Sequence, residues 1–398
     1  MNNRSGGNAF RSDFVSAHVT DKTCRGPCDE PAACTAGKRR PGADQENPFV
    51  GQQEIADALG LARSTVAAHI VQLMNKGHIL GRGYLLASEA RAVCIGGAVL
   101  DRKYHARAKI VLETSNPVDS TRSLGGVARN VAENLARLGS STGFISIVGD
   151  DDGGHALLKY MREIGIDVSQ VVTTNERPTA EYAAILDAAG DLVLGIADMS
   201  IFDLFQPDHI ERAWPHLASA GWVFADCNLS ADALSTLITK CRSASCRLAI
   251  DAVSTHKAAR LPKDLAGIDL LFMNIDEANA ILGLSNEHTP DGARQAALAL
   301  QQTGAAMAVV SAGARGMAVA GSETETFIEA VKATPVDMTG AGDAMIAATL
   351  HRLLEGDDIF DAARTGALAA TLTTECASSV HPGLSAAFLE EHRHRLKS

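Results

Sequence analysis

The stretch "DMTGAGDAMIAATLHRLLEG", residues 337–356, joins a glycine-rich turn to an apolar helix. Gly340, Ala341 and Gly342 carry little or no side chain, so their backbone N–H groups can approach an anion closely. The helix that they open adds the positive end of its dipole at the same point. Asp343 stands at the helix start, where it can accept the proton of a hydroxyl that attacks the bound anion. The alternative is a glycine-rich helix start in which Asp343 is only a cap, and the spacing alone does not decide between them.

Short apolar strands alternate with helical segments on the N-terminal side of this stretch. The runs rich in β-branched and apolar residues are "AVCIGGAV" (92–99), "TGFISIVG" (142–149), "GWVFADC" (221–227), "CRLAIDAV" (246–253), "IDLLFMN" (268–274) and "AAMAVVSAG" (305–313). Each is followed by a helical stretch, such as "GGHALLKYMREIG" after the second. This alternation predicts an α/β domain over residues 90–398, with a mostly parallel sheet covered by helices on both faces.

Two segments break the alternation. Residues 103–123 and 179–198 favour paired antiparallel strands, with turns at Asn116-Pro117 and Gly190-Asp191. Strands inserted in this way would form a small sheet, a lid, over one edge of the domain. Their free edges invite pairing between two subunits, so we expect a homodimer through the lid.

The chemistry of such a domain is expected where the strands end, because ligands of open parallel sheets bind at the carboxyl ends of the strands. The residues at these positions are mostly carboxylates, amides and glycines: Asp101, Gly125, Gly126, Asn130, Asp226, Asn228, Asp251, Asn274, Glu277, Ser311, Gly313, Gly316 and the segment from Gly340 to Asp343.

The N-terminal part of the chain has a different texture. Residues 1–45 are rich in Gly, Pro, Ser and mixed charge, which predicts a disordered tail. Residues 46–89 hold two short helical patterns separated by Gly60, followed by "HILGRGYLL", a pattern similar to a winged helix-turn-helix. The second helix would present Arg63, Ser64, Thr65 and His69 to DNA, and Arg82 on the wing would meet phosphate. A small helical module without nucleic acid is the alternative, because the basic face is thin.

Composition and charge limit the classes of function that remain for this chain. A net charge of -11 argues against binding of nucleic acid or a membrane surface by the chain as a whole. No apolar run is long enough for a membrane span, and the first residues lack the apolar centre of a secretory signal, so we expect a cytoplasmic protein. The 8 cysteines are scattered as reduced thiols would be, and Cys24, Cys28 and Cys34 lack the fourth ligand of a zinc site.

Several spaced motifs together resemble the ribokinase-like, PfkB-type carbohydrate kinases over residues 92–390. They are "GGAVLD" (96–101), "LGGVARNVAENLARLG" (124–139), "VGDDDGGHALLKYMREIGID" (148–167), "NIDEANAIL" (274–282) and "DMTGAGDAM" (337–345), in the family's order. The resemblance implies a ribokinase-like fold and phosphoryl transfer from ATP, with Mg²⁺, to an alcohol.

The resemblance also assigns roles to residues. Asp343 would be the catalytic base, and Gly340, Ala341 and Gly342 the anion hole. Asn274 and Glu277 would order Mg²⁺ and phosphate through water, and Ser311, Gly313 and Gly316 would lie beside the ATP phosphates. Asp337 and Thr339 would hold a monovalent cation, K⁺. The residues expected on the acceptor sugar are Asp101, Gly125, Gly126 and Asn130.

Within the family, "SNPVDS" (115–120), "LGIADMSIFD" (194–203), "VFADCNLS" (223–230) and "DAVSTHKAARL" (251–261) look most like pseudouridine kinases. Asn116, Thr179 and Asp198 are therefore added as substrate contacts on the lid. Another ribonucleoside, such as inosine, adenosine or uridine, or a free sugar is the alternative acceptor. Ala252 and Met338 depart from the pattern of this subgroup. The alternative of another class is a DNA-binding regulator that only senses a nucleoside.

Overall fold

The computed structural model describes residues 52–75, 79 and 91–396 of the chain. The chain divides into two units, Met1–Leu86 and Ala87–Ser398. The expected tail (1–45) and all of the expected wing except Ile79, Arg82 included, lie outside the described residues.

The described part of the first unit is a helix pair. α2 (Gln52–Leu59) ends at Gly60, whose φ of 65° is the left-handed geometry that a helix terminator adopts. α3 (Arg63–Asn75) follows after Gly60, Leu61 and Ala62. The buried side chains between the helices are Ile55, Ala56, Val66, Ile70 and Ile79. The helix-turn-helix pattern of the sequence therefore packs as a small apolar core.

The second unit contains an eight-stranded sheet with the order β14-β13-β12-β11-β10-β9-β1-β4. Its strands are β1 (Arg91–Ile95), β4 (Ser141–Ile145), β9 (Trp222–Asp226), β10 (Leu248–Asp251), β11 (Leu270–Asn274), β12 (Met307–Ser311), β13 (Gly316–Ala320) and β14 (Glu325–Glu329). Six neighbouring strands pair in parallel, namely β4, β1, β9, β10, β11 and β12 in sheet order. β13 and β14 are antiparallel at one edge. The predicted mostly parallel sheet is confirmed.

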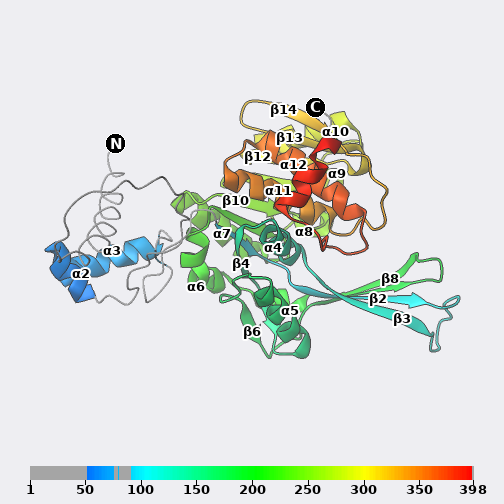
Figure 1. Cartoon of the computed structure of the whole chain (residues 1–398), viewed down its shortest axis with the longest axis horizontal. Helices are drawn as coiled ribbons and strands as arrows, with labels where there is room; N and C mark the ends of the chain where they lie inside the picture. The colour runs from blue at the N-terminus through cyan, green and yellow to red at the C-terminus, as the bar shows by residue number, and fades with distance from the viewer. Residues whose placement is uncertain (1–51, 76–78, 80–90, 397–398) are drawn as a thin grey trace, which may run out of the picture. The chain divides into compact units, whose positions relative to one another are not determined.

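Helices cover both faces of this sheet (Figure 1). One face packs against α4 (Val127–Arg137), α5 (Asp152–Glu163), α11 (Ala341–Glu355) and α12 (Ile359–Thr374). The other packs against α6 (Pro207–Ala218), α7 (Ala231–Ala244), α8 (Thr255–Ala258), α9 (Ile275–Leu282) and α10 (Pro290–Gln302). Neighbouring residues of β1 alternate between the two cores: Val93 and Ile95 join one, Ala92 and Cys94 the other.

Smaller elements complete the unit. β5 (Ile147–Gly149) pairs in parallel with β6 (Val172–Thr174), because the expected strand 142–149 breaks at Ser146. The remaining helices are η1 (Ser200–Leu204), η2 (Gly313–Arg315), α13 (Ala386–His392) and η3 (Arg393–Arg395).

The lid is a four-stranded sheet that projects from the α/β body (Figure 1). Its order is β3-β2-β7-β8, formed by the hairpins β2 (Val99–Ala106) with β3 (Val118–Gly125) and β7 (Glu181–Leu186) with β8 (Leu192–Asp198). A parallel pairing of β2 with β7 joins them. The lid begins at Val99, earlier than the expected residue 103, because Gly96 and Gly97 interrupt the chain after β1. Asp101 therefore lies inside a lid strand and not in a loop.

Among the described residues, none of the helices is long and apolar enough to cross a membrane.

Candidate active site

Asp226, at the end of β9, holds several loops together at the carboxyl edge of the sheet. Its carboxylate accepts hydrogen bonds from the backbone N–H groups of Gly97 (3.0 Å), Ala128 (2.8 Å) and Asn228 (2.9 Å). The side chain is fully buried. These donors come from the turn between β1 and β2, from the first turn of α4 and from the loop after β9. One carboxylate thus fixes the segments that bring Asn130 and Asp101 to the site.

Asp343 lies in the first turn of α11, in the middle of this edge. Gly340 is the N-cap residue with a φ of 81°, and a Cβ there would lie 1.8 Å from the Ser379 carbonyl oxygen. Only glycine fits this position. Because glycine has no side chain to cap the helix, the first-turn N–H groups keep no side-chain acceptor. A Cβ at Gly342 would meet nothing within 4 Å, so the segment Gly340 to Gly342, called the anion loop below, faces open space.

Burial raises the pKa of Asp343 from 3.8 to about 7, against the hydrogen bond from Asn130 and the positive charge of Arg129. The Nδ2 of Asn130 donates to Oδ2 of Asp343 at 2.6 Å. A carboxylate with a pKa near the working pH is well suited to accept a proton. The two residues that the sequence assigned to base and acceptor wall therefore touch each other.

A buried polar chain continues behind Asn130. Arg129 donates to Oδ1 of Asn130 and to Glu133, and also to the Leu124 carbonyl at 2.7 Å. Glu133 is 3% exposed and accepts from Tyr160 at 2.6 Å. The guanidinium of Arg129 thus orients the amide of Asn130 from the side opposite Asp343 and places a fixed positive charge near the base.

Asp101 faces the same site from β2. A Cβ at Gly125, on the paired strand β3, would lie 2.1 Å from Oδ2 of Asp101, so the glycine leaves the room that this carboxylate occupies. Burial raises the pKa of Asp101 to about 6, against the charges of Arg129 and Lys103. The negative charge of Asp101 in turn contributes to the raised pKa of Asp343. Gly126 follows Gly125 as the N-cap of α4.

Two further acids follow strand ends: Asp251 ends β10, and Glu277 lies in the first turn of α9, after β11. Burial, together with the negative charges of Glu277 and Asp343, raises the pKa of Asp251 well above its ordinary value. Burial likewise raises the pKa of Glu277. Asn274 and Glu277 form a reciprocal cap of α9: Asn274 N donates to Glu277 Oε2 and Glu277 N to Asn274 Oδ1, both at 2.8 Å. The predicted Mg²⁺ residues therefore also have a local structural role.

The residues predicted beside ATP lie at the next strand end. Ser311 ends β12 directly opposite Asn274 of β11 in the parallel register. Gly313 and Gly316 bound the short turn η2 that leads into β13. The structure thus brings Asn274 and Ser311 side by side and leaves backbone-rich, side-chain-poor turns next to them, as a phosphate-binding edge requires.

Asp337 and Thr339 lie in the segment that enters α11. Oδ1 of Asp337 accepts from the N–H of Thr339 at 2.8 Å, and Oδ2 pairs with Nζ of Lys103 at 3.0 Å. Partial burial opposes it, but the hydrogen bonds from Thr339 and Lys103 hold the pKa of Asp337 below its ordinary value. The predicted cation site therefore has a lysine ammonium as its neighbour.

Three predicted lid contacts lie in local hydrogen-bond networks. Asn116 bonds to Val111 within the β2–β3 connection, through both backbone groups of Val111 at 2.8 Å. The Thr179 hydroxyl donates to Asp151 at 2.8 Å and accepts from Gly149 N at 3.0 Å. Exposed Asp198 accepts from Ser200. None of these bonds reaches Asp343 or Asp101, and the substrate role of the three residues stays a prediction.

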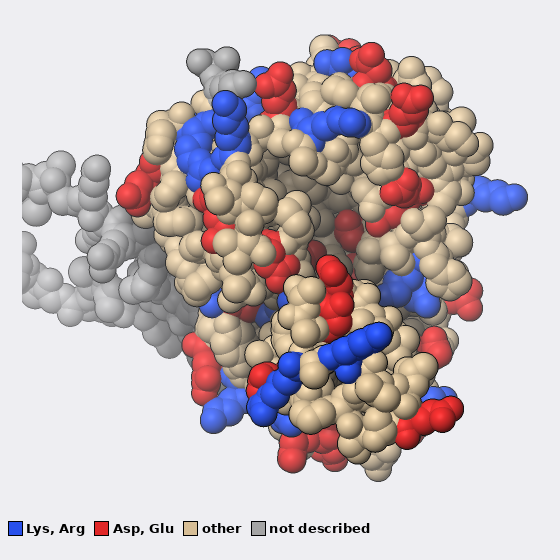
Figure 2. All heavy atoms as spheres, turned by 90° about the vertical axis from the view of Figure 1, so that its right-hand side faces the viewer, with Lys and Arg blue, Asp and Glu red and all other residues tan. Residues whose placement is uncertain are grey.

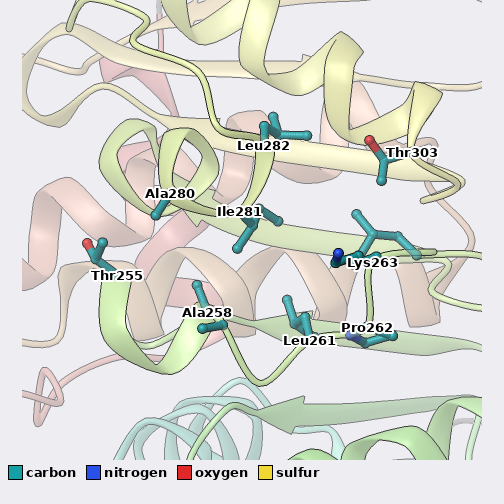
Figure 3. Close-up of a pocket in the computed structure, with 11 residues that line it drawn as sticks. Thr255, Ala258, Leu261, Pro262, Lys263, Ala280, Ile281, Leu282 and Thr303 are labelled. Atoms are coloured by element: carbon teal, nitrogen blue, oxygen red, sulfur yellow. The ribbon is translucent and has the colours of Figure 1, made fainter.

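The lid-side face of the molecule is hollowed, with Asp and Glu side chains at the rim and inside (Figure 2). A separate cavity of about 240 Å³ lies between α8, the following loop and α9 (Figure 3). Mostly apolar side chains such as Ala258, Leu261, Ile281 and Leu282 line it, and no predicted site residue does. No carboxylate lines it, so it offers no side chain that could take the proton of an acceptor hydroxyl.

Several residues of the site have no specific role that the sequence alone assigns. The sequence places Asp226 and Asp251 at the ends of apolar strands, and a carboxylate in that position is the signal by which they can be found. No sequence pattern indicates a role for Lys103 or Lys257 in the site. Lys257 Nζ donates to Asn228 Oδ1 at 2.5 Å, and burial lowers its pKa although the negative charge of Asp226 opposes this.

Both units of the chain resemble known protein families. Residues 89–386 match the model of the pfkB family carbohydrate kinases, and residues 45–79 match a winged helix-turn-helix DNA-binding model. The chain is 34% identical to the uncharacterized sugar kinase YeiI of Escherichia coli, over 86% of this chain and 94% of the relative. It is 29% identical to the pseudouridine kinase of the same organism, over 74% of this chain and 94% of the relative.

A solved carbohydrate kinase from Agrobacterium tumefaciens superposes with a TM-score of 0.69 at 31% identity, over 77% of this chain and 98% of that one. The family match covers residues 89–386, which include the lid, Asp343 and the strand-end carboxylates. The chain therefore belongs to the pfkB family of carbohydrate kinases, phosphotransferases with an alcohol acceptor.

Proposed function

We propose that this kinase transfers the γ-phosphoryl group of ATP to the 5′-hydroxyl of pseudouridine, giving pseudouridine 5′-phosphate and ADP. The observation that carries the proposal is Asp343, buried at the uncapped start of α11 and bonded to Asn130 at 2.6 Å. A pKa of about 7 gives it the proton affinity of an effective base near neutral pH.

The proposed reaction uses the side chains and N–H groups at this edge of the sheet. Asp101 accepts hydrogen bonds from the acceptor's ribose hydroxyls and orients the 5′-hydroxyl toward Asp343. Asp343 takes the hydroxyl proton as the oxygen bonds to the γ-phosphorus and the bond to the ADP oxygen breaks. The N–H groups at Gly340, Ala341 and Gly342 stabilise the negative charge on the phosphoryl oxygens during transfer.

Kinases of this family use ATP with Mg²⁺. Within the described residues, no group of three acidic, His or Cys side chains forms a ready metal cage. Mg²⁺ retains water ligands and is held largely by phosphate, and we propose Glu277 as the carboxylate on its water shell. Bound Mg²⁺ neutralises phosphate charge. For Asp337 and Thr339 we propose K⁺ as ligand; faster turnover in K⁺ than in a bulky organic cation would support this, and equal rates would remove it.

The acceptor is the finer part of the proposal. The segments 115–120, 194–203, 223–230 and 251–261 and the 29% identical pseudouridine kinase support a nucleoside with a C-linked base. The 34% identical sugar kinase has no stated acceptor, so inosine, adenosine, uridine and ribose remain the competitors. We expect pseudouridine to have the highest kcat/KM in a matched series of these acceptors. A higher value for any other acceptor would replace the substrate but keep the phosphoryl transfer.

A second function is proposed for the N-terminal unit, namely DNA binding modulated by the nucleoside. Residues 45–79 match a DNA-binding model, and Arg63, Ser64 and Thr65 are exposed at the start of α3. A gel-shift with DNA from upstream of its own gene, with and without nucleoside, tests this. An Arg63→Ala variant should weaken the shift, and no binding even at low salt would dismiss the function.

We also propose that the protein is a homodimer through the lid. All residues of the edge strand β8 are exposed, including Leu192, Leu194 and Ile196, which are 51–58% exposed. An exposed apolar edge strand is a surface for pairing with a second copy. Sedimentation should give a dimer for the wild type and a monomer for Leu194→Glu with Ile196→Glu. A monomeric wild type would refute the arrangement.

A further inference from the structure

An ion pair joins the lid to the segment that enters the anion loop. Lys103 lies on β2, and Asp337 lies 234 residues further along the chain, three residues before Gly340. Nζ of Lys103 is 3.0 Å from Oδ2 of Asp337, and the two side chains are 37% and 25% exposed. The pair is therefore partly shielded from water, where a charged hydrogen bond is worth more than at a fully exposed site.

Both ends of the pair act on site residues. Lys103 follows Asp101 by two positions on the same strand, so both side chains lie on one face of the lid. On the other side, Oδ1 of Asp337 accepts from the N–H of Thr339 at 2.8 Å. The carboxylate that bonds to Lys103 is thus the one that shapes the backbone entering the anion loop.

We propose that Lys103 is a positioning residue that fastens the lid to the anion loop through Asp337. Closure of the lid over the acceptor and alignment of the N–H groups at Gly340, Ala341 and Gly342 are then one event. The inference rests on the proposed phosphoryl transfer, and it adds a residue to which the reaction itself assigns no chemical step.

The same strand offers a matched control. Arg102 pairs with Glu181 of β7 at 2.7 Å, with side chains 31% and 36% exposed, but this ion pair lies within the lid. Arg102→Met removes a cation of similar exposure from the neighbouring position without touching the anion loop. A general loss of lid stability would appear in both Arg102→Met and Lys103→Met. Loss of the link between the lid and the anion loop would appear only in Lys103→Met.

Steady-state kinetics of Lys103→Met, Asp337→Asn, the double variant and Arg102→Met test the proposal. Lys103→Met should lower kcat roughly tenfold, the effect of losing one charge-assisted hydrogen bond, with a smaller change in the KM for ATP. Lys103→Arg should recover most of the rate. The double variant should be no slower than the slower single variant, because both substitutions break one contact. Wild-type kinetics for Lys103→Met, or losses that multiply in the double variant, would overturn it.

Hydrogen exchange separates this inference from the proposed function. Lys103→Met should speed exchange of backbone amides both in β2 and in residues 334–342, and Arg102→Met should speed it in the lid alone. Absence of kinase activity in the wild type would refute the proposed function, but the exchange rates of the variants could still be measured and compared. Unchanged exchange in residues 334–342 of Lys103→Met would refute the coupling even if the wild type is an active kinase.

Discussion

Replacing the buried base by its neutral isostere should stabilise the fold at neutral and higher pH. Asp343 is buried, and its pKa is raised from 3.8 to about 7 chiefly by that burial. In an Asp343→Asn variant, the new side-chain amide keeps an oxygen that can accept the 2.6 Å hydrogen bond from Asn130. The substitution therefore removes the cost of a buried charge without removing its main contact.

The magnitude follows from the shift. Native Asp343 stays protonated up to about pH 7, whereas the unfolded chain releases this proton near pH 3.8. The native state thus binds more protons between these values, and the stability of the wild type falls as the pH rises through this window. A shift from 3.8 to about 7 corresponds to roughly 4 kcal/mol. The variant should be more stable by about this amount at pH 8, and the difference should vanish near pH 4.

Urea unfolding of both proteins at several pH values measures the difference. Asp167→Asn is the matched control, because the pKa of Asp167 is lowered: burial opposes this, but Ser169 and the Arg91 guanidinium at 2.5 Å favour the charged form. That variant should be less stable than the wild type at pH 8. An Asp343→Asn protein no more stable than the wild type at pH 8 would refute the reasoning that burial sets the proton affinity of the base.

Three further substitutions test the framework of the site. Asp226→Asn removes a carboxylate that accepts several backbone N–H groups, and urea unfolding should show a loss of roughly 3 kcal/mol; an unchanged midpoint would contradict its role as a hub. Gly340→Ala places a Cβ 1.8 Å from the Ser379 carbonyl, so turnover should fall at least tenfold, and turnover at the wild-type rate would contradict the need for glycine at this position. Glu133→Leu leaves Arg129 buried without its carboxylate and should cost about 3–5 kcal/mol in calorimetry, whereas a neutral effect would mean that the ion pair does not hold the network.

Local patterns predicted much of the fold. Apolar runs of strand length predicted the parallel sheet, because strands buried on both faces need uninterrupted apolar side chains. The glycine-rich elbow predicted the start of α11 and the place of Asp343, since both depend on neighbouring residues only. The spacing of Asn274 and Glu277 is likewise that of a capping box.

Contacts between distant segments were not available from such patterns. The bond from Asn130 to Asp343 joins residues 213 positions apart, and the pair of Lys103 with Asp337 spans 234. Sequence periodicity does not specify that β2 pairs with β7, which places Asp101 in the lid. Resemblance alone assigns Asn116, Thr179 and Asp198 to the substrate. Side chains of turns and loops bond equally well within the protein, as Asn116 and Asp198 do to neighbouring residues and Thr179 does to Asp151 and Gly149.

The most direct test of phosphoryl transfer with Asp343 as base is ATP-dependent ADP release with pseudouridine, uridine, inosine, adenosine and ribose, in the wild type and in Asp343→Asn. Because the isostere keeps the fold and removes only the proton acceptor, its rate with the best acceptor should be ~10²- to 10⁴-fold lower. Turnover of Asp343→Asn at the wild-type rate, in a protein shown to be folded, would contradict the mechanism.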